Sequence, residues 1–268
     1  MSSAVVNGVE LNYRMEGDGH ETIVLVNGLA DDLETWAYQF DALLGAGYRV
    51  LRFDNRGVGS SSKPLGPYTT RMFAEDTKAL VEHLGLNGLH MLGVSMGGMI
   101  AQEYALGWPD DLVSLTLACT YAAPGPFCGR MFEFWADLAT HDGLPSVMRD
   151  VTLWAFTPEF FEERPEEAAE FDTAMRMIDQ PVPAYLAQLW SIQHHDTSDR
   201  LGSIKTPTLV LAGEQDILIP VALSRQLHKA IPGSEWATTA GGHACIWEHP
   251  DEFNRCVIDF LSRHRRQQ

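Results

Sequence analysis

The sequence has few cysteines, no long hydrophobic run and no secretory pattern at its start. Its four cysteines, at positions 119, 128, 245 and 256, show neither CxxC nor zinc-type spacing, so neither a redox motif nor a zinc site is expected. A basic segment followed by an apolar one, typical of a signal peptide, is missing. The apolar stretch over residues 89–100 is too short for a membrane span and contains glycines. We therefore expect a cytoplasmic protein with free thiols.

Basic residues are also scarce. The chain carries 19 Lys and Arg against 36 Asp and Glu, a formal net charge of −17. Such a charge repels phosphate backbones and anionic lipid, which disfavours nucleic acid and membranes as partners. With 268 residues, of which 45% are hydrophobic, the composition is that of a globular chain with one large or two small domains. It does not indicate an oligomeric state.

Strand-like and helix-like patterns alternate in the first and last parts of the chain. Short apolar runs bounded by turn residues are typical of buried parallel strands, and the segments between them have apolar residues at helical spacing. This order predicts an α/β fold, with helices on both faces of a mostly parallel, doubly wound sheet. Predicted strands cover residues 9–14, 21–26, 48–53, 89–94, 112–118, 208–212 and 235–239, and predicted helices cover 34–43, 70–84, a segment ending at 106, 221–230 and 251–264.

The middle of the chain follows a different pattern. Residues 121–202 are rich in aromatic residues, Met and Glu, have helical spacing and are divided by prolines. This pattern predicts a helical cap inserted into a core formed by residues 1–120 and 203–268. Within the cap, residues 159–172 are mostly acidic with phenylalanines interleaved, which favours one solvated amphipathic helix.

The strongest local motif is G-x-S-x-G around Ser95, with Gly93 and Gly97 on either side. An apolar strand ends at this motif and a helix begins after it. A tight strand-to-helix turn needs small neighbours beside the serine, and it projects the hydroxyl at a helix N-terminus. This context predicts that Ser95 is a nucleophile. The alternative is a glycine-rich turn in which the serine is incidental.

A nucleophilic serine needs a histidine base and a carboxylate that orients the base. His243 follows the predicted strand 235–239 in a glycine-containing loop, and Asp216 follows the strand 208–212 with apolar residues after it. Ser95, Asp216 and His243 also occur in the order that this kind of triad requires in a sheet of this type. His249 and Glu214 are the nearby alternatives for the base and the acid.

Acyl transfer also needs donors for a tetrahedral oxyanion. The backbone N–H of Met96, the residue after the serine, is one candidate. The loop after strand 21–26 offers a second, because Gly28 lets the backbone turn and Leu29 can then present its N–H. An Asn-Gly turn present only for its geometry is the alternative reading of this loop.

Taken together, these motifs resemble the α/β-hydrolase superfamily over nearly the whole chain. The resemblance is closest to 3-oxoadipate enol-lactonases and bacterial carboxylesterases, over residues 48–126. Many relatives carry His-Gly where this chain has Asn27-Gly28, and the common RGHG loop reads Arg56-Gly57-Val58-Gly59 here. The matching segments are Val24-Leu25-Val26-Asn27-Gly28, Arg52-Phe53-Asp54-Asn55-Arg56-Gly57-Val58-Gly59-Ser60-Ser61, Gly93-Val94-Ser95-Met96-Gly97-Gly98, Ala212-Gly213-Glu214-Gln215-Asp216 and Gly242-His243.

The resemblance and the motifs together predict a serine hydrolase that cleaves a small carboxylic ester or lactone through an acyl-enzyme on Ser95. No metal ion or organic cofactor is expected. A C–C bond hydrolase or a perhydrolase could use the same triad, and a ligand-binding, receptor-like protein on this fold is a third hypothesis. Candidate pocket residues are Asn27, Trp135, Trp154 and Trp190. The adjacent pair His194-His195 lacks the i, i+4 spacing of a helical metal site.

Overall fold

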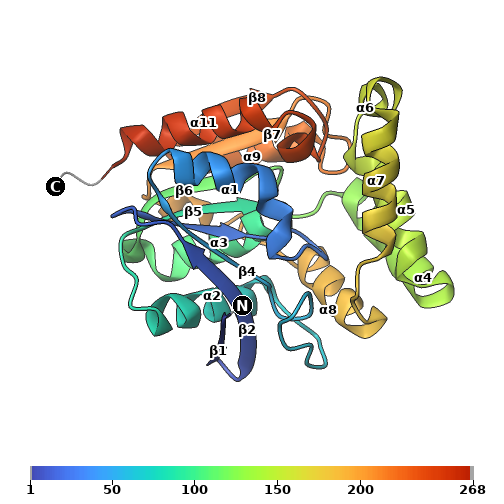
Figure 1. The fold of residues 1–268 in the computed structure, drawn as a ribbon, viewed down its shortest axis with the longest axis horizontal. Helices are drawn as coiled ribbons and strands as arrows, with labels where there is room; N and C mark the ends of the chain where they lie inside the picture. The colour runs from blue at the N-terminus through green and yellow to red at the C-terminus, as the bar shows by residue number, and fades with distance from the viewer. Residues whose placement is uncertain (1, 266–268) are drawn as a thin grey trace.

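The computed structural model describes residues 2–265 and contains one eight-stranded sheet. Its strand order is β1-β2-β4-β3-β5-β6-β7-β8 (Figure 1). The first two strands pair antiparallel to each other and to β4, and all later neighbours are parallel. The prediction of a mostly parallel sheet is therefore confirmed. The strands are β1 (Ser2–Val6), β2 (Val9–Glu16), β3 (Thr22–Val26), β4 (Arg49–Phe53), β5 (Leu89–Val94), β6 (Leu112–Ala118), β7 (Thr208–Gly213) and β8 (Glu235–Thr239).

Helices cover both faces of the sheet, which explains why its central strands are apolar throughout. Every residue of β3, β5 and β7 is buried, as expected for parallel strands between two helical layers. Successive residues of β3 face opposite cores: Val24 belongs to the core that contains Phe73, and Leu25 belongs to the core that contains Phe253. The helices on the first side are α2 (Thr70–His83), α3 (Met96–Gly107) and α9 (Val221–Ala230), and those on the second are α1 (Ala37–Gly45) and α11 (Pro250–Arg263).

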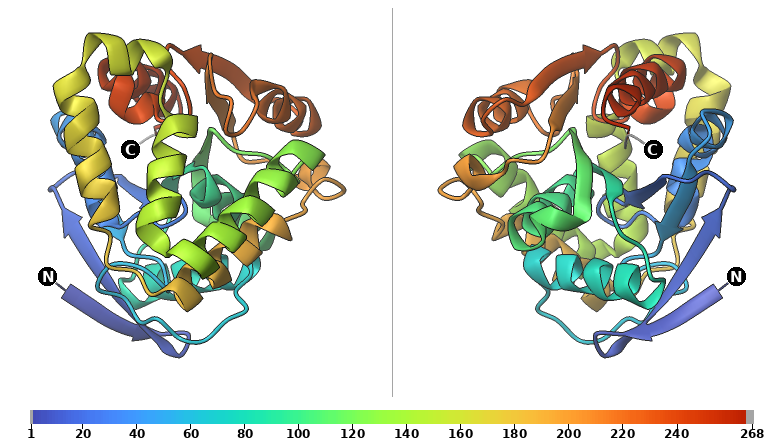
Figure 2. Two further views of the ribbon diagram at one scale, coloured as in Figure 1. Left: turned by 90° about the vertical axis from the view of Figure 1, so that its right-hand side faces the viewer. Right: turned by 90° about the vertical axis from the view of Figure 1, so that its left-hand side faces the viewer.

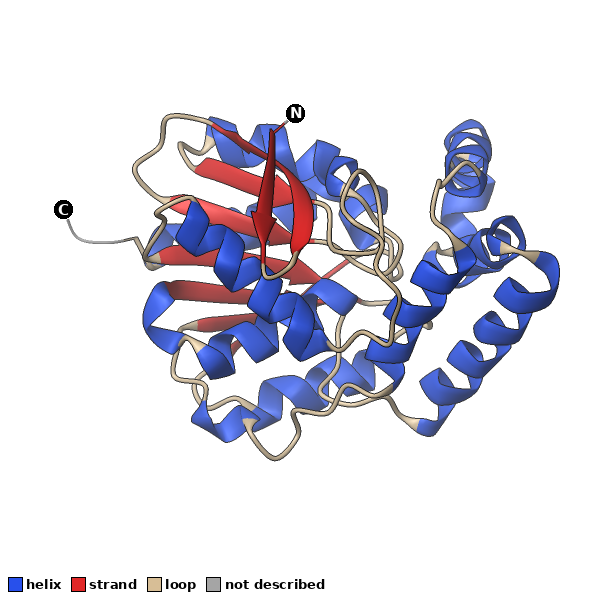
Figure 3. Ribbon diagram, turned by 90° about the horizontal axis from the view of Figure 1, so that it is seen from below, coloured by secondary structure: helices blue, strands red, loops and turns tan. Residues whose placement is uncertain are grey.

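Five further helices lie beyond one end of the sheet, between β6 and β7 in the chain (Figures 1 and 3). A view from that side shows them in front of the strands (Figure 2, left). Each has a proline in its first turn, where the missing N–H costs no helical hydrogen bond. The helices are α4 (Pro126–Asp142), α5 (Leu144–Ala155), α6 (Pro158–Glu163), α7 (Pro165–Arg176) and α8 (Val182–Gln193).

Several elements differ from the sequence prediction. The edge strand β1 was not predicted. The expected single helix over 159–172 is wrong, because the helix is interrupted at Arg164, the residue before Pro165. The expected amphipathic, solvated character is confirmed: Glu162, Glu163 and Glu166 are exposed, whereas Phe160 is buried and the ring centroid of Phe171 lies 5.0 Å from that of Phe156.

A short helix, α10 (Cys245–Glu248), was also not predicted. Within residues 2–265, no helix combines the length and the apolar character needed to cross a bilayer.

Candidate active site

Ser95 stands in the turn between β5 and α3, in a backbone conformation that few residues adopt. Its φ is 55° and its ψ is −120°, a strained geometry that the surrounding structure must maintain. A Cβ on Gly93 would lie 2.2 Å from the carbonyl oxygen of Gly97, and a Cβ on Gly97 would lie 1.9 Å from that of Val26. Only glycine fits at either position, so the two glycines of the motif are required by the closeness of the backbones.

Hydrogen bonds hold this turn against the neighbouring strand. The Ser95 N–H donates to the carbonyl oxygen of Ala118 at 2.9 Å, and the Thr120 hydroxyl donates to the carbonyl oxygen of Ser95 at 2.8 Å. The side chain of Ser95 is left partly exposed. The turn therefore presents its hydroxyl while its backbone is fixed.

Asp216 and His243 form a hydrogen-bonded pair beyond the ends of β7 and β8. His243 Nδ1 lies 2.8 Å from Asp216 Oδ2. The other carboxylate oxygen of Asp216 accepts the Ile219 N–H at 2.8 Å, and the side chain is almost fully buried. Since Nδ1 is occupied, Nε2 is the ring nitrogen free for proton transfer.

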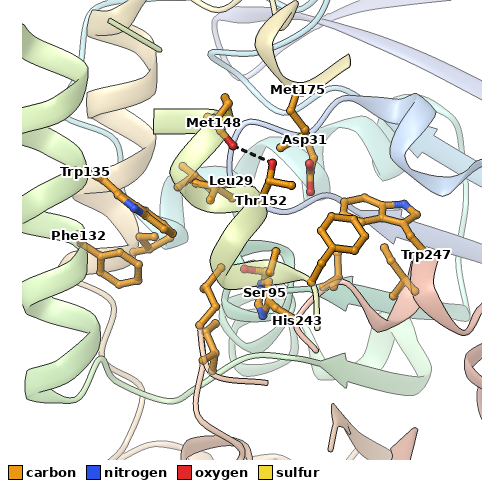
Figure 4. A pocket seen from close by; sticks show the side chains of 18 of the residues that line it. Leu29, Asp31, Ser95, Phe132, Trp135, Met148, Thr152, Met175, His243 and Trp247 are labelled. Atoms are coloured by element: carbon orange, nitrogen blue, oxygen red, sulfur yellow. Dashed lines mark hydrogen bonds between the residues drawn. The ribbon is translucent and has the colours of Figure 1, made fainter. Parts of the chain in front are cut away.

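Ser95 and His243 line the same cavity, and their side chains lie together in Figure 4. The carboxyl ends of β5, β7 and β8 thus bring three residues distant in sequence to one edge of the sheet, where sites of α/β proteins are usually found. The two alternatives are not in this cavity. Glu214 is exposed and accepts a hydrogen bond from the Thr238 hydroxyl, and His249 is exposed at the start of α11.

The loop that carries His243 is tied to the helices beyond the sheet through Glu248. This buried carboxylate accepts the Gly242 N–H at 2.8 Å with one oxygen and the Thr157 hydroxyl at 2.6 Å with the other. The Ala244 N–H donates to the carbonyl oxygen of Ala155 at 2.8 Å. Sequence analysis missed Glu248. Its local sequence does not indicate that its carboxylate binds both the nearby Gly242 N–H and the distant Thr157 hydroxyl.

Leu29 lines the cavity and Met96 is the first residue of α3. Within residues 2–265, neither backbone N–H donates to another group. The residue after Leu29, Ala30, has a φ of 63° and donates its N–H to Gln188 Oε1 of α8. Both N–H groups are thus available to an oxygen bound near Ser95.

The candidate pocket residues behave differently from one another. Trp135 lines the cavity that contains Ser95, and its Nε1 donates to Asp150 Oδ2 at 2.7 Å. Trp154 donates to the same oxygen at 3.0 Å and does not line the cavity. Trp190 is 46% exposed and stacks on His194, because it lies on the outer face of α8.

Asn27 also lies outside the cavity. Its side chain is completely buried, accepts a hydrogen bond from Trp36 Nε1 at 2.6 Å and donates to the carbonyl oxygen of Phe53 at 2.8 Å. Its role in the structure is to join the ends of β3 and β4, so its prediction as a pocket residue is not supported.

Asp31 is a cavity residue that sequence analysis missed. It follows the loop after β3 and lines the cavity together with Ser95 and His243 (Figure 4). Burial, assisted by the charge of Asp32, raises the pKa of Asp31 to about 7, although His243 and hydrogen bonds from Gly28 and Thr35 act in the opposite direction. Its position just after a parallel strand was a usable signal, since such loops gather at one edge of the sheet.

One cluster beside the pair has metal-ligand chemistry. Cys119 Sγ, an Asp216 oxygen and a His243 nitrogen lie within 4.8 Å of one another. A hydrogen bond with Cys245 and burial raise the pKa of the Cys119 thiol well above its usual range. A protonated thiol is a weak ligand and a weak nucleophile, so this cluster does not indicate a metal centre.

Comparison with known proteins agrees with the fold and with hydrolysis. A family model described as the alpha/beta hydrolase fold matches residues 21–250. A protein from Caulobacter sp. that carries the name carbamate hydrolase RutD is 28% identical, over 98% of both chains. The 3-oxoadipate enol-lactonase 2 of Acinetobacter baylyi is 30% identical, over 95% of this chain and 94% of its own. The crystal structure of the enol-lactonase from Burkholderia xenovorans superposes with a TM-score of 0.90 at 32% identity, covering 97% of this chain and all of the other.

Proposed function

We propose that this chain cleaves a carboxylic ester or a lactone with Ser95 as the nucleophile. The chain belongs to the α/β-hydrolase family, and its relatives support hydrolysis as its activity. The observation that carries the proposal is the 2.8 Å contact between His243 Nδ1 and Asp216 Oδ2, beside a cavity that His243 shares with Ser95. A buried carboxylate in this position orients the imidazole and stabilises its protonated form.

In the proposed reaction, His243 Nε2 takes the proton of the Ser95 hydroxyl as Oγ attacks the carbonyl carbon. The N–H groups of Leu29 and Met96 donate to the tetrahedral oxyanion. His243 then gives the proton to the leaving oxygen, which departs as an alcohol or, from a lactone, stays in the acyl chain. A water molecule, deprotonated by His243, attacks the acyl-enzyme and releases the acid.

The relatives favour an acyl compound as substrate, since their names include an enol-lactonase and a carbamate hydrolase. The cavity favours an apolar acyl or alcohol group, because most of its lining consists of Leu, Met, Ile, Phe and Trp side chains. The same triad could also hydrolyse a C–C bond or transfer an acyl group to peroxide. A panel of p-nitrophenyl esters, lactones and β-diketones separates these reactions.

We further propose that residues 121–202 act as a cap that selects the substrate, over a core of residues 1–120 and 203–268. Trp135 supports this role, since it projects from α4 into the cavity beside Phe132. The proposed cellular setting remains the cytoplasm, where the buried thiols of Cys119 and Cys245, which form no disulfide, would stay reduced.

The experiment that tests the proposal combines labelling with turnover. Wild-type protein should react with a fluorophosphonate at Ser95 and hydrolyse p-nitrophenyl esters or lactones over many cycles. Ser95→Ala should lose both properties and keep its circular dichroism spectrum, whereas Ser198→Ala, at an exposed serine, should keep both. Labelling of Ser95→Ala would refute the assignment, and one turnover per molecule would favour a ligand-binding protein instead.

A further inference from the structure

The cavity around Ser95 contains a second carboxyl group that the proposed mechanism does not use. A Cβ placed on Gly28 would lie 2.6 Å from Asp31 Oδ2 and 3.5 Å from Ser95 Cβ. The Asp31 carboxyl and the nucleophile therefore both lie beside this glycine, close to where a substrate carbonyl would be attacked. Figure 4 shows the Asp31 side chain projecting into the same space as Ser95 and His243.

No Lys or Arg side chain among the described residues balances this carboxyl group inside the cavity. Among the described residues that line it there is no Lys or Arg, and the polar ones besides Asp31 are Ser95, Thr152 and His243. The Thr152 hydroxyl donates to the carbonyl oxygen of Met148 in its own helix, and His243 Nδ1 is bonded to Asp216. A carboxylate on a substrate would therefore enter an apolar space without a cation to pair with, which is costly.

The approach to the cavity has the same charge. A groove outside it is bordered by the segment 30–38, residues 58–60 and the end of α7, and it shares Asp31, Met175 and Trp247 with the inner cavity. Its lining includes four carboxylates and, among the described residues, no Lys or Arg; the four are Asp31, Asp32, Glu34 and Asp179. Glu34 is paired with Arg14 and Arg52, which do not line the groove, so the negative charge of the groove comes from the other three. Asp31 thus stands where an acidic groove meets an apolar chamber, and like charge lowers the local concentration of anions in such a groove.

We propose that Asp31 is a specificity residue that disfavours substrates with a carboxylate, so that the substrate of this chain is an uncharged, largely apolar ester or lactone. This inference rests on the proposed function and names the substrate class of the same site. It also separates this chain from the relatives named for 3-oxoadipate, since adipate is a dicarboxylic acid.

The ionisation of Asp31 supplies a specific signature. The charged or titratable groups that act on it are Asp32 and His243. With a pKa of about 7, Asp31 is mostly neutral at pH 6 and mostly charged at pH 8.5. Discrimination against an anionic substrate should therefore increase as the pH rises from 6 to 8.5. A substrate carboxylate, with a pKa near 4, stays ionised throughout.

The test uses two substrates that differ only in charge: the 4-nitrophenyl monoester of adipic acid, and the same ester with the free carboxylate replaced by a primary amide. The quantity measured is the ratio of kcat/KM for the amide to that for the carboxylate. Any effect of pH on the chemical step itself is common to both substrates and cancels in the ratio. In the wild type we expect the ratio to exceed about tenfold at pH 8.5, since two charges a few ångströms apart at a protein surface repel by more than this, and to fall at pH 6.

Asp31→Asn should reduce the ratio at pH 8.5 about tenfold and remove its pH dependence. The matched control is Asp18→Asn, which removes the same charge from an exposed residue in the loop before β3. This variant should leave the ratio at pH 8.5 and its pH dependence unchanged. A ratio that is the same in the wild type and in Asp31→Asn would overturn the inference.

If Asp31→Asn does not fold, the pH dependence of the wild-type ratio still decides, and a flat profile overturns the inference. Failure of the proposed function gives a different result, since neither ester would then be hydrolysed faster by wild type than by Ser95→Ala.

Discussion

The backbone N–H of Ala30 donates a hydrogen bond to Gln188 Oε1, 3.1 Å away, across 158 positions of sequence. This contact joins the loop that carries the Leu29 N–H to helix α8 beyond the sheet. Gln188 is completely buried, and its Nε2 donates to the carbonyl oxygen of Arg56 at 2.9 Å. One side chain thus holds two loops at the edge of the sheet, which makes it a positioning residue for the proposed oxyanion site.

Gln188→Met should lower both stability and kcat. It leaves the Ala30 N–H and the Arg56 carbonyl without partners, and a buried polar group without a hydrogen bond costs about 1–3 kcal/mol. We expect the free energy of unfolding to fall by about 2 kcal/mol or more. The Leu29 N–H would also be less well placed, and since loss of an oxyanion donor costs about 10²- to 10³-fold, we expect a decrease of about tenfold in kcat with little change in KM.

The matched control is Gln193→Met, on the same helix and partly exposed. It should change the unfolding free energy by less than about 0.5 kcal/mol and leave kcat as it is. Denaturant unfolding and steady-state kinetics on one ester measure both quantities. If Gln188→Met were less stable but had the wild-type kcat, the glutamine would anchor α8 without positioning the oxyanion site.

Asp216→Asn and Glu214→Gln separate the two candidate acids. An amide at position 216 would place an NH2 group against His243 Nδ1 or force the wrong tautomer, and in related triads this change costs roughly 10⁴-fold in kcat. We therefore expect a loss of about 10³- to 10⁴-fold for Asp216→Asn. Glu214 is exposed and accepts a hydrogen bond from the Thr238 hydroxyl, so Glu214→Gln should stay within about twofold of wild type. The reverse pattern in kcat would reassign the acid.

His195 should make the protein less stable in mild acid. It is buried, its Nδ1 lies 2.9 Å from the Thr70 hydroxyl oxygen, and burial lowers its pKa to about 3. An unfolded histidine has a pKa of about 6.5. Below that pH the unfolded chain takes up a proton that the folded chain does not, so this contribution to stability decreases as the pH falls from 6.5 towards 3.

His195→Asn keeps a polar group near Thr70 and does not titrate. Between pH 7 and pH 5 the wild type should lose about 2 kcal/mol more of its unfolding free energy than this variant, since one pKa unit corresponds to about 1.4 kcal/mol. Urea unfolding at the two pH values measures the difference. His20→Asn, at an exposed histidine, should follow the wild type. Parallel profiles for wild type and His195→Asn would contradict the prediction.

Much of the sheet could be predicted from the sequence because its signals are local. Strands buried on both faces are continuous apolar runs, and the turn at Ser95 needs glycines at two nearby positions. The edge strand β1 was missed because its buried residues, Ala4 and Val6, alternate with exposed ones in a segment of only five residues. Its place depends on pairing with β2, which a short pattern does not indicate.

The lining of the cavity could not be predicted in the same way. Trp135 and Trp190 both lie in helices of the segment 121–202, yet one faces the cavity and the other faces solvent. Which face of α8 is inward follows from its buried residues, such as Tyr185, Gln188 and Ile192. Trp190 lies two positions after Gln188 and so points the opposite way.

The sequence by itself determined the kind of fold, the turn that exposes Ser95 and the candidates for its partners, because these depend on residues close together in the chain. Only the tertiary structure placed His243 against Asp216, joined Gln188 to Ala30 and set Asp31 and Ser95 beside the same glycine, Gly28. The physical reason is that distances and burial arise where distant segments pack. Charge at the site, and with it the proposed choice of substrate, depends on that packing.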